Sequence, residues 1–266
     1  MELTLYQIDA FTEEVFKGNY AAVIIVEEWL SGDLMQKIAS ENNVSETAFV
    51  KLISNNHYAI RWFSPLCEID FCGHATLASA FVLFNNTQHN NLIFSADAVG
   101  EVTITKKKNG LISMLFPNTF PVVINNVPEA LLSGLSIQPR EVLKNNQAYF
   151  AIYENEQQIH QITANASQLK KLAPYDVVVS SKADKVSDYD FISRYFWPAN
   201  GGDEDAVTGS IHTGLAPYWA KLLGKNNLKA YQASIRGGLL YCKVLNNKVE
   251  ISGKAVQYLK GVITIA

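Results

Sequence analysis

Glu46 is the first residue in the sequence whose type and place suit it to proton transfer. It lies in the segment 45–50, SETAFV, between a predicted helix and an apolar predicted strand. A carboxylate at such a junction can be partly withdrawn from water, and this suits it to accept and return a proton. The alternative is a solvated loop acid without a chemical role, and position alone leaves both interpretations open.

Two glycines, Gly73 and Gly209, each precede a stretch that predicts an apolar helix. The first N–H groups of a helix are unpaired and carry partial positive charge, and glycine lets a ligand approach the backbone. Two such helix starts facing one cleft would hold a carboxylate from both sides. His74 and Ser210 follow the glycines and could add side-chain hydrogen bonds. The alternatives are ordinary turn glycines, with Ser210 as a helix N-cap.

Asp205 ends the acidic run 203–205, which leads to Gly209. It is a further polar candidate for the same site. The alternative is that the whole run is a solvated acidic loop.

The elements that would position these residues follow from alternation and helical spacing. A cluster of proline and asparagine at 117–128 predicts a boundary between two lobes. We expect residues 1–118, joined by a last strand near 261–266, to form an N-terminal lobe, and 119–260 to form a C-terminal lobe, with the active cleft between them. The expected helices are 33–41, 75–84, 128–136 and 209–223. The expected strands are 3–8, 21–26, 47–53, 57–63, 92–96, 99–106, 111–116, 147–153, 175–181, 230–236, 238–245, 248–252 and 261–265.

A faint internal repeat supports two related lobes. The segment 61–65, RWFSP, matches 194–198, RYFWP. Each copy leads to acidic residues and then to the glycine of a predicted helix. The repeat predicts a tandem duplication with an active cleft between the halves.

Composition places the chain among globular proteins. Apolar residues make up 48% and charged residues 18% of the 266 residues, and the net charge is −3. This balance gives no electrostatic case for nucleic acid or a membrane surface. The amino terminus shows no signal-peptide pattern, and no apolar run is long enough to span a membrane. Three cysteines do not make a disulfide framework, which predicts a reducing compartment such as the cytoplasm.

Seven short motifs occur in an order that resembles the phenazine-biosynthesis (PhzF-like) family of isomerases. Together they cover nearly the whole chain. The motifs are 9–12 DAFT, 18–19 GN, 45–49 SETAF, 61–65 RWFSP, 72–78 CGHATLA, 204–210 EDAVTGS and 232–238 QASIRGG.

The resemblance implies an α+β fold of the diaminopimelate-epimerase type, with two pseudo-symmetric lobes that each wrap a sheet around a central helix. It implies that Glu46 is the catalytic acid/base. It also implies that a small acidic substrate is bound by His74, Asp205, Ser210, Gly73, Gly209 and Asn19. No metal and no organic cofactor are implied, and the sequence has no nucleotide-binding glycine motif, Cys-x-x-Cys or His-x-x-x-His. A cytoplasmic homodimer in a biosynthetic process is expected by the same resemblance.

Two departures from the family pattern matter. Tyr20 follows Gly18-Asn19 where the family usually has proline, which affects the loop and pocket near Asn19. Cys72 occupies the place of the first thiol of related two-cysteine racemases, but 205–208, DAVT, has no cysteine for the second lobe. A two-thiol epimerisation is therefore disfavoured, and Cys72, Cys67 and Cys242 are interpreted as small buried residues.

We therefore expect a cofactor-free isomerase that moves a proton on a small carboxylate-bearing metabolite through Glu46. The first alternative is an amino-acid epimerase on the same fold. The second is a non-catalytic protein that binds or senses a small molecule. The sequence does not identify the substrate, the pathway or the oligomeric state.

Overall fold

The computed structural model describes residues 1–265 and divides the chain into two compact units. Unit 1 contains Met1–Leu115 and the segment that starts at Ser252, and unit 2 contains Phe116–Ile251. The chain therefore passes from one unit to the other twice, within β8 (Ile112–Pro117) and within β17 (Lys248–Gly253). Position 266, where the last predicted strand was expected to end, lies outside the described residues.

The return to unit 1 comes earlier than the boundary expected at 260. The last strand, β18 (Ala255–Thr264), pairs antiparallel with β1 (Glu2–Ala10) along its whole length, from Ala10↔Ala255 to Glu2↔Thr264. Because these backbone hydrogen bonds tie 255–264 to β1, the whole strand belongs to unit 1.

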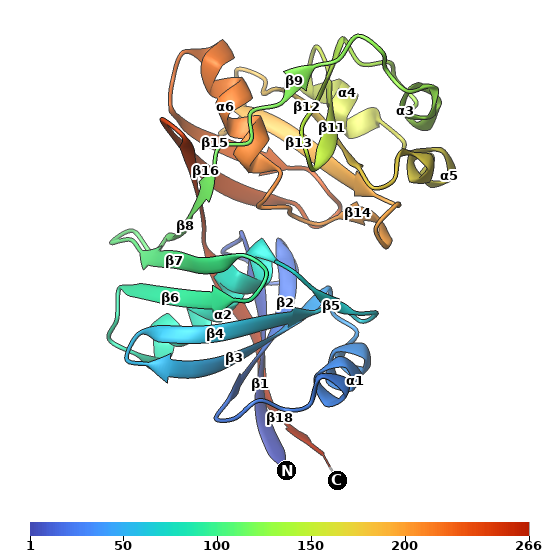
Figure 1. Cartoon of the computed structure of the whole chain (residues 1–266). Coiled ribbons are helices and arrows are strands. Elements are labelled where there is room, and N and C mark those ends of the chain that lie inside the picture. The colour runs from blue at the N-terminus through green and yellow to red at the C-terminus, as the bar shows by residue number, and fades with distance from the viewer. Residues whose placement is uncertain (266) are drawn as a thin grey trace. The chain divides into compact units, whose positions relative to one another are not determined.

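Unit 1 is a mixed sheet packed against a buried helix (Figure 1). β1 and β2 are antiparallel, β2 and β3 parallel, and β3 and β4 antiparallel. β4 then pairs antiparallel with β5 and parallel with β6, and β6, β7 and β8 continue as an antiparallel run. The bounds are β2 (Asn19–Val26), α1 (Gly32–Asn42), β3 (Glu46–Ser54), β4 (His57–Phe63), β5 (Glu68–Ile69), α2 (Gly73–Asn86), β6 (Asn91–Ala96) and β7 (Gly100–Lys106).

Helix α2 is the central helix of unit 1. Its residues are apolar or small on nearly all sides, and ten of its fourteen are buried. Such a helix is stable only inside a protein, and α2 packs against β1, β2 and β3. The sequence-based expectation of a buried helix here is confirmed.

Unit 2 repeats these pairings in the same order. β10 and β11 are antiparallel, β11 and β12 parallel, and β12 and β13 antiparallel. β13 pairs antiparallel with β14 and parallel with β15, which pairs antiparallel with β16. The bounds are β9 (Val122–Val123), α3 (Glu129–Gly134), β10 (Glu141–Lys144), β11 (Ala148–Ile152), α4 (Glu156–Gln161), α5 (Ala166–Leu169), the 3-10 helix η1 (Lys170–Leu172), β12 (Asp176–Lys182), β13 (Phe191–Trp197), β14 (Gly202–Asp205), α6 (His212–Leu223), β15 (Asn227–Gln232) and β16 (Gly238–Leu245).

The sequence repeat marks equivalent places in the two units. Arg61 on β4 makes two hydrogen bonds of 2.6 and 2.7 Å to Glu68 on β5. Arg194 on β13 makes two of 2.8 Å to Glu204 on β14. The acid stands beside the phenylalanine of its own motif in both pairs of strands, because Phe63 pairs with Glu68 and Phe196 with Glu204. The predicted fold, an α+β protein of two pseudo-symmetric lobes, is confirmed.

No helix within residues 1–265 is long and apolar enough to cross a membrane.

Candidate active site

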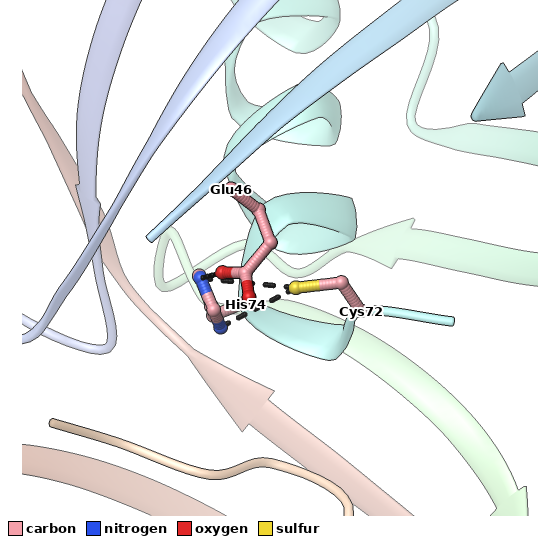
Figure 2. A group of neighbouring side chains, drawn as sticks. All are labelled: Glu46, Cys72 and His74. Carbon is pink, nitrogen blue, oxygen red and sulfur yellow. Dashed lines mark hydrogen bonds and ion pairs between the residues drawn. The ribbon is translucent and has the colours of Figure 1, made fainter. Parts of the chain in front are cut away.

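Three side chains of unit 1 meet where β3 begins and α2 begins (Figure 2). Glu46 is the first residue of β3, and His74 lies in the first turn of α2 directly after Gly73. Cys72 is the residue before that helix. Strand β3 runs parallel to β2, with Glu46 beside Ala21, and α2 packs against both strands. This packing buries all three side chains: Glu46 is 8% exposed, His74 7% and Cys72 6%.

The Glu46 carboxylate lies against the imidazole of His74. Oε2 of Glu46 is 2.7 Å from Nε2 of His74, close enough for an ion pair. The contact is not aligned as a hydrogen bond, and within residues 1–265 no other group donates one to this oxygen. A buried carboxylate oxygen without an aligned donor is costly unless something else supplies a proton. Glu46 therefore has a buried oxygen whose capacity to accept a hydrogen bond is not used by an aligned donor within residues 1–265.

Asn19 holds the other side of the imidazole. Its side chain is fully buried, and its Nδ2 lies 3.1 Å from Nδ1 of His74. The Ser45 hydroxyl donates to Oδ1 of Asn19 at 3.3 Å. With the amide in this orientation, a neutral imidazole has Nδ1 as the acceptor and its hydrogen on Nε2, toward Glu46. In the charged imidazole both ring nitrogens carry hydrogen, and Nδ1 also has the Cys72 sulfur 3.5 Å away as an acceptor. Asn19 thus positions His74 for its contact with the carboxylate.

The turn before Asn19 requires glycine at Gly18. Its φ is +65°, and a Cβ there would lie 2.1 Å from the carbonyl oxygen of Ala10. Tyr20, which replaces the usual proline of the family pattern, is the second residue of β2 and pairs with Asp9 of β1. The strand therefore starts at Asn19 and continues through Tyr20.

The charges in this cluster act on one another. Burial opposes the charged form of His74, but the Cys72 sulfur and the Glu46 carboxylate outweigh it, and the pKa of His74 is raised well above its usual value. Burial, followed by the Glu46 charge, raises the pKa of Cys72 to about 11 despite the opposing effect of His74. A thiol with this pKa is neutral near pH 7, so the contact that favours the His74 proton is the one with Glu46, 2.7 Å away.

Glu46, Cys72 and His74 are also a set of donor types that could bind a metal. One ligand atom from each lies within 4.8 Å of the others. Two ligands of a tetrahedral zinc are about 3.3 Å apart when each bond is about 2.0–2.2 Å long. The 2.7 Å between Glu46 and His74 is shorter. The spacing fits an acid–base pair better than a metal cage.

Gly73 leaves open space at the start of α2. A Cβ placed on it would meet only a ring carbon of Phe71, at an ordinary 3.8 Å. Neither packing nor a positive φ requires glycine here. A bare backbone at this position is consistent with close approach of a ligand.

The helix expected at 209–223 begins three residues later than predicted. Helix α6 begins at His212, not at Gly209, and Ser210 is not its N-cap. The ring Nδ1 of His212 donates to the Thr208 carbonyl at 2.8 Å, so the backbone N–H of His212 bonds instead to Gly209 at 3.2 Å. Gly209 and Ser210 therefore belong to a tight turn that precedes the helix.

Asp205 is part of a hydrogen-bonded loop in unit 2. Its Oδ2 accepts from the Thr208 hydroxyl at 2.5 Å. Gln232, fully buried, accepts from Thr208 N at 2.9 Å and donates to the Asp205 carbonyl at 3.0 Å. Ser234 donates to the Ala206 carbonyl at 2.7 Å. The motif 232–238 thus serves to shape the loop 205–208, and the acidic loop is not simply solvated.

The structure brings the sequence-predicted residues together in two groups. Asn19, Glu46, Gly73 and His74 share one cluster in unit 1, and Asp205, Gly209 and Ser210 share one loop in unit 2. Their roles toward a ligand, and a cleft shared by both groups, stay predictions. Sequence reasoning missed Gln147, which donates to Ser210 at 2.9 Å.

The interpretation of the three cysteines is partly wrong. Cys72 and Cys242 are buried as expected, but Cys67 is exposed. Cys67 lies in a turn that the Ser64 hydroxyl holds, accepting from the Cys67 N–H at 3.0 Å. A turn on the surface leaves its side chain in water.

Comparison with known proteins gives one consistent result. The family described as "Phenazine biosynthesis-like protein" matches residues 8–261. An uncharacterized isomerase of Pseudomonas aeruginosa is 42% identical over 264 residues, 99% of each chain. A PhzF-family phenazine biosynthesis protein of Enterococcus faecalis, known from a crystal structure, is 41% identical, with a TM-score of 0.93 over 100% of both chains.

More distant structures share the fold alone. A hydroxyproline epimerase from Agrobacterium vitis, solved with trans-4-hydroxy-L-proline bound, has a TM-score of 0.58 over 98% of this chain and 92% of its own, at 11% identity. The match over most of the chain, together with relatives above 30% identity along their whole length, shows that this chain belongs to the phenazine biosynthesis-like (PhzC-PhzF) family.

Proposed function

We propose that this protein is a cofactor-free isomerase that moves a proton within a small carboxylate-bearing molecule, with Glu46 as the proton carrier. At the level of the family, relatives named as isomerases support an isomerase. The observation that carries the finer proposal is the buried Oε2 of Glu46, 2.7 Å from His74 and without an aligned hydrogen-bond donor.

The proposed reaction uses one carboxylate in both directions. A C–H bond of the substrate breaks, its electron pair shifts into a neighbouring unsaturated system, and the proton moves to an oxygen of Glu46. Glu46 then gives that proton to a different carbon on the same face, so the product is an isomer and the carboxylate is restored. His74, held by Asn19 and Glu46, stabilises the negative charge that develops between the two steps.

The proposed ligand contacts fit a carboxylate. A Cβ at Gly73 would meet only Phe71, and a helix start carries partial positive charge that favours an anion. In unit 2, Gly209 and Ser210 lie in a turn before α6, next to the loop of Asp205. Asp205, Gly209 and Ser210 are proposed as further contacts of the substrate.

The asymmetry of the two units favours a proton shift over a two-base epimerisation. Cys72 and Thr208 occupy equivalent places, because the Cys72 carbonyl accepts from Thr76 and the Thr208 carbonyl from His212, each four residues on. Where unit 1 has a thiol, unit 2 therefore has a hydroxyl that is already bonded to Asp205. A second base of the thiol type is missing from the position where the fold would supply it.

The deciding experiment is solvent exchange with Glu46→Gln. Small unsaturated and cyclic carboxylic acids are incubated with the protein in heavy water, and deuterium at carbon is followed by mass spectrometry and NMR. We expect exchange and turnover to fall by about 10²–10⁴-fold in the variant, the usual range for a general acid/base, while ligand binding persists. Glu41→Gln, the same change on an exposed glutamate of α1, is the control and should match wild type.

Normal exchange in Glu46→Gln would exclude Glu46 as the carrier. Inverted stereochemistry at the exchanging carbon would favour the epimerase instead. Tight carboxylate binding by the wild type without any exchange would favour the non-catalytic binding protein.

A further inference from the structure

Unit 2 contains a hydrogen-bonded row of side chains that ends at Ser210. The Tyr195 hydroxyl donates to Oδ2 of Asp176 at 2.5 Å. The side-chain amide of Gln147 lies 3.0 Å from the same Tyr195 oxygen and 2.9 Å from Oγ of Ser210. All four residues are in unit 2. Asp176, Tyr195 and Gln147 lie outside the seven motifs that carry the family resemblance, and only Ser210 lies within one of them.

The direction of every bond in this row follows from Asp176. Asn200 donates to the Pro174 carbonyl at 3.2 Å and to Oδ1 of Asp176 at 2.7 Å, so its NH₂ end faces the carboxylate. Burial raises the pKa of Asp176, and the hydrogen bonds from Tyr195 and Asn200 oppose that rise by favouring the charged form. In the charged form the carboxylate only accepts hydrogen bonds. Oδ2 must therefore receive the hydrogen of Tyr195, which leaves the Tyr195 oxygen as an acceptor toward Gln147.

The orientation of Gln147 is then fixed. Only its NH₂ end can donate to the Tyr195 oxygen, and the same nitrogen is the atom that faces Ser210. The two hydrogens of this NH₂ group serve the two oxygens, one each. Ser210 therefore accepts from Gln147, and its own hydrogen must point away from the row.

We propose that Asp176, Tyr195 and Gln147 are positioning residues that fix the Ser210 hydroxyl as a hydrogen-bond donor to an oxygen of the bound anion. This rests on the proposed function, in which Ser210 contacts the substrate. A free serine hydroxyl can donate or accept. One that is already held as an acceptor by Gln147 favours a ligand group that only accepts, such as a carboxylate, over one that only donates, such as an ammonium.

The duplication of the fold explains where this row comes from. Asp176 pairs with Ala148 at the start of β12, as Glu46 pairs with Ala21 at the start of β3. The acid of the row thus stands in unit 2 at the place that Glu46 holds in unit 1.

The other members follow the same register. Tyr195 takes the place of Trp62 in the repeated motif, and Gln147, directly before Ala148, takes the place of Tyr20. In unit 1 the carboxylate touches the helix-start residue directly, whereas in unit 2 it reaches Ser210 through two side chains. The two equivalent acids therefore have different roles: Glu46 carries a proton, and Asp176 orients the Ser210 hydroxyl as a donor.

Hydrogen positions test the row without any ligand. A neutron crystal structure of the deuterated wild-type protein should show both deuterium atoms of the Gln147 NH₂ on Tyr195 and Ser210, and the Ser210 deuterium directed elsewhere. The carbonyl oxygen of Gln147 facing Ser210, or the Ser210 deuterium pointing at Gln147, would overturn the proposal.

Binding tests its consequence, with benzoate as the probe. We expect Tyr195→Phe, which keeps the ring and removes the hydroxyl, to weaken benzoate binding roughly 3- to 10-fold, the range for one hydrogen bond. In a Ser210→Ala background the same change should have no further effect, because there is no hydroxyl left to orient. Tyr153→Phe is the matched control: it removes another buried hydroxyl, bonded to the Ile137 carbonyl at 2.7 Å, and should leave benzoate affinity unchanged.

Additive losses in the Tyr195→Phe, Ser210→Ala double variant would overturn the coupling and leave Tyr195 a merely structural residue. Failure of the wild type to bind benzoate would count against the proposed function. The neutron structure would still decide the direction of the row in that case.

Discussion

At the residue scale, the partners of a side chain decide what it can do in the Glu46 cluster. Glu46 and Cys72 are both buried and both contact His74, Glu46 Oε2 at 2.7 Å from Nε2 and the Cys72 sulfur at 3.5 Å from Nδ1. Burial raises the pKa of Cys72 to about 11. The thiolate, not the thiol, is the reactive form, so Cys72 is a weak base and nucleophile near neutral pH.

Replacing Cys72 with serine should therefore leave most of the activity in place. Serine keeps the size and removes the sulfur, and the measurement is turnover of any substrate found by the deuterium screen. Cys67→Ser, at an exposed cysteine in the same unit, is the control. Complete loss of turnover in a folded Cys72→Ser protein would revive a thiol mechanism.

The charge on His74 should make stability depend on pH. Its pKa is raised in the fold, whereas an unfolded histidine has a pKa of about 6.5. The stabilisation is therefore complete below about pH 6.5 and is lost as pH rises through the folded-state value. Thermal unfolding should show a larger gap between wild type and His74→Gln at about pH 6 than at about pH 10.

The control for this pH series is His160→Gln, a change at an exposed histidine of α4. The difference in thermal stability between His160→Gln and wild type should vary less with pH. A His74→Gln gap that stays constant from acid to alkaline pH would contradict the charged imidazole.

At the scale of elements, the start of α2 can be tested apart from its side chains. Gly73→Ala should fold, because a Cβ there meets only Phe71 at 3.8 Å. Its unfolding free energy should be equal to that of wild type or higher by up to about 1 kcal/mol, since alanine favours helices. Benzoate affinity should fall, because the methyl group covers the backbone that the anion approaches.

Gly32→Ala is the matched control for this change. Gly32 is also the first residue of a helix, α1, and its Cβ would meet only Arg61 at 3.8 Å. It should leave benzoate affinity unchanged. Equal benzoate affinity in Gly73→Ala and wild type would show that the α2 start does not hold the anion.

Long, strongly patterned elements were predictable from the sequence, and short ones were not. The alternating strand 57–63 and the apolar helix around 75–84 were found within a few residues. The helices α4 and α5 and the strand β10 have four to six residues each, too few for a periodic signal. The start of α6 was misplaced because a local side-chain contact, the His212 ring on the Thr208 carbonyl, has no sequence pattern.

The candidate site was predictable only where a motif marked it. Glu46 and His74 lie in motifs of the family resemblance, and the structure joins them. Gln147 and Asp176 lie in no such motif. Gln147 is 63 residues before Ser210 in the chain, although the two side chains are hydrogen-bonded. Contacts over such distances depend on strand register, which the sequence did not reveal.

At the scale of the whole molecule, the duplicated Arg–Glu pairs allow a comparison between the units. The side chains of Arg61 and Glu68 are 34% and 43% exposed, whereas those of Arg194 and Glu204 are 16% and 24% exposed. Arg194 also donates to the carbonyls of Ile159 and Ile162. The Arg194–Glu204 pair of unit 2 is thus more buried and makes more hydrogen bonds than the Arg61–Glu68 pair of unit 1.

Arg61→Met should cost less than about 1 kcal/mol of unfolding free energy, as for an exposed ion pair. Arg194→Met should cost more, about 3–5 kcal/mol, because it leaves a half-buried carboxylate and two carbonyls without their donor. Urea unfolding of both variants measures the difference. Equal costs would show that the two pairs are energetically interchangeable despite their burial.

The return of β18 to unit 1 has a consequence for synthesis of the chain. A ribosome releases β1 early, then all of unit 2, and only afterwards the strand that pairs with β1 from Ala10↔Ala255 to Glu2↔Thr264. During translation one long edge of β1 stays without its partner, and open strand edges invite pairing with other chains. Unit 2 can therefore finish folding on the ribosome first, and nascent unit 1 is the part of the molecule most in need of a chaperone.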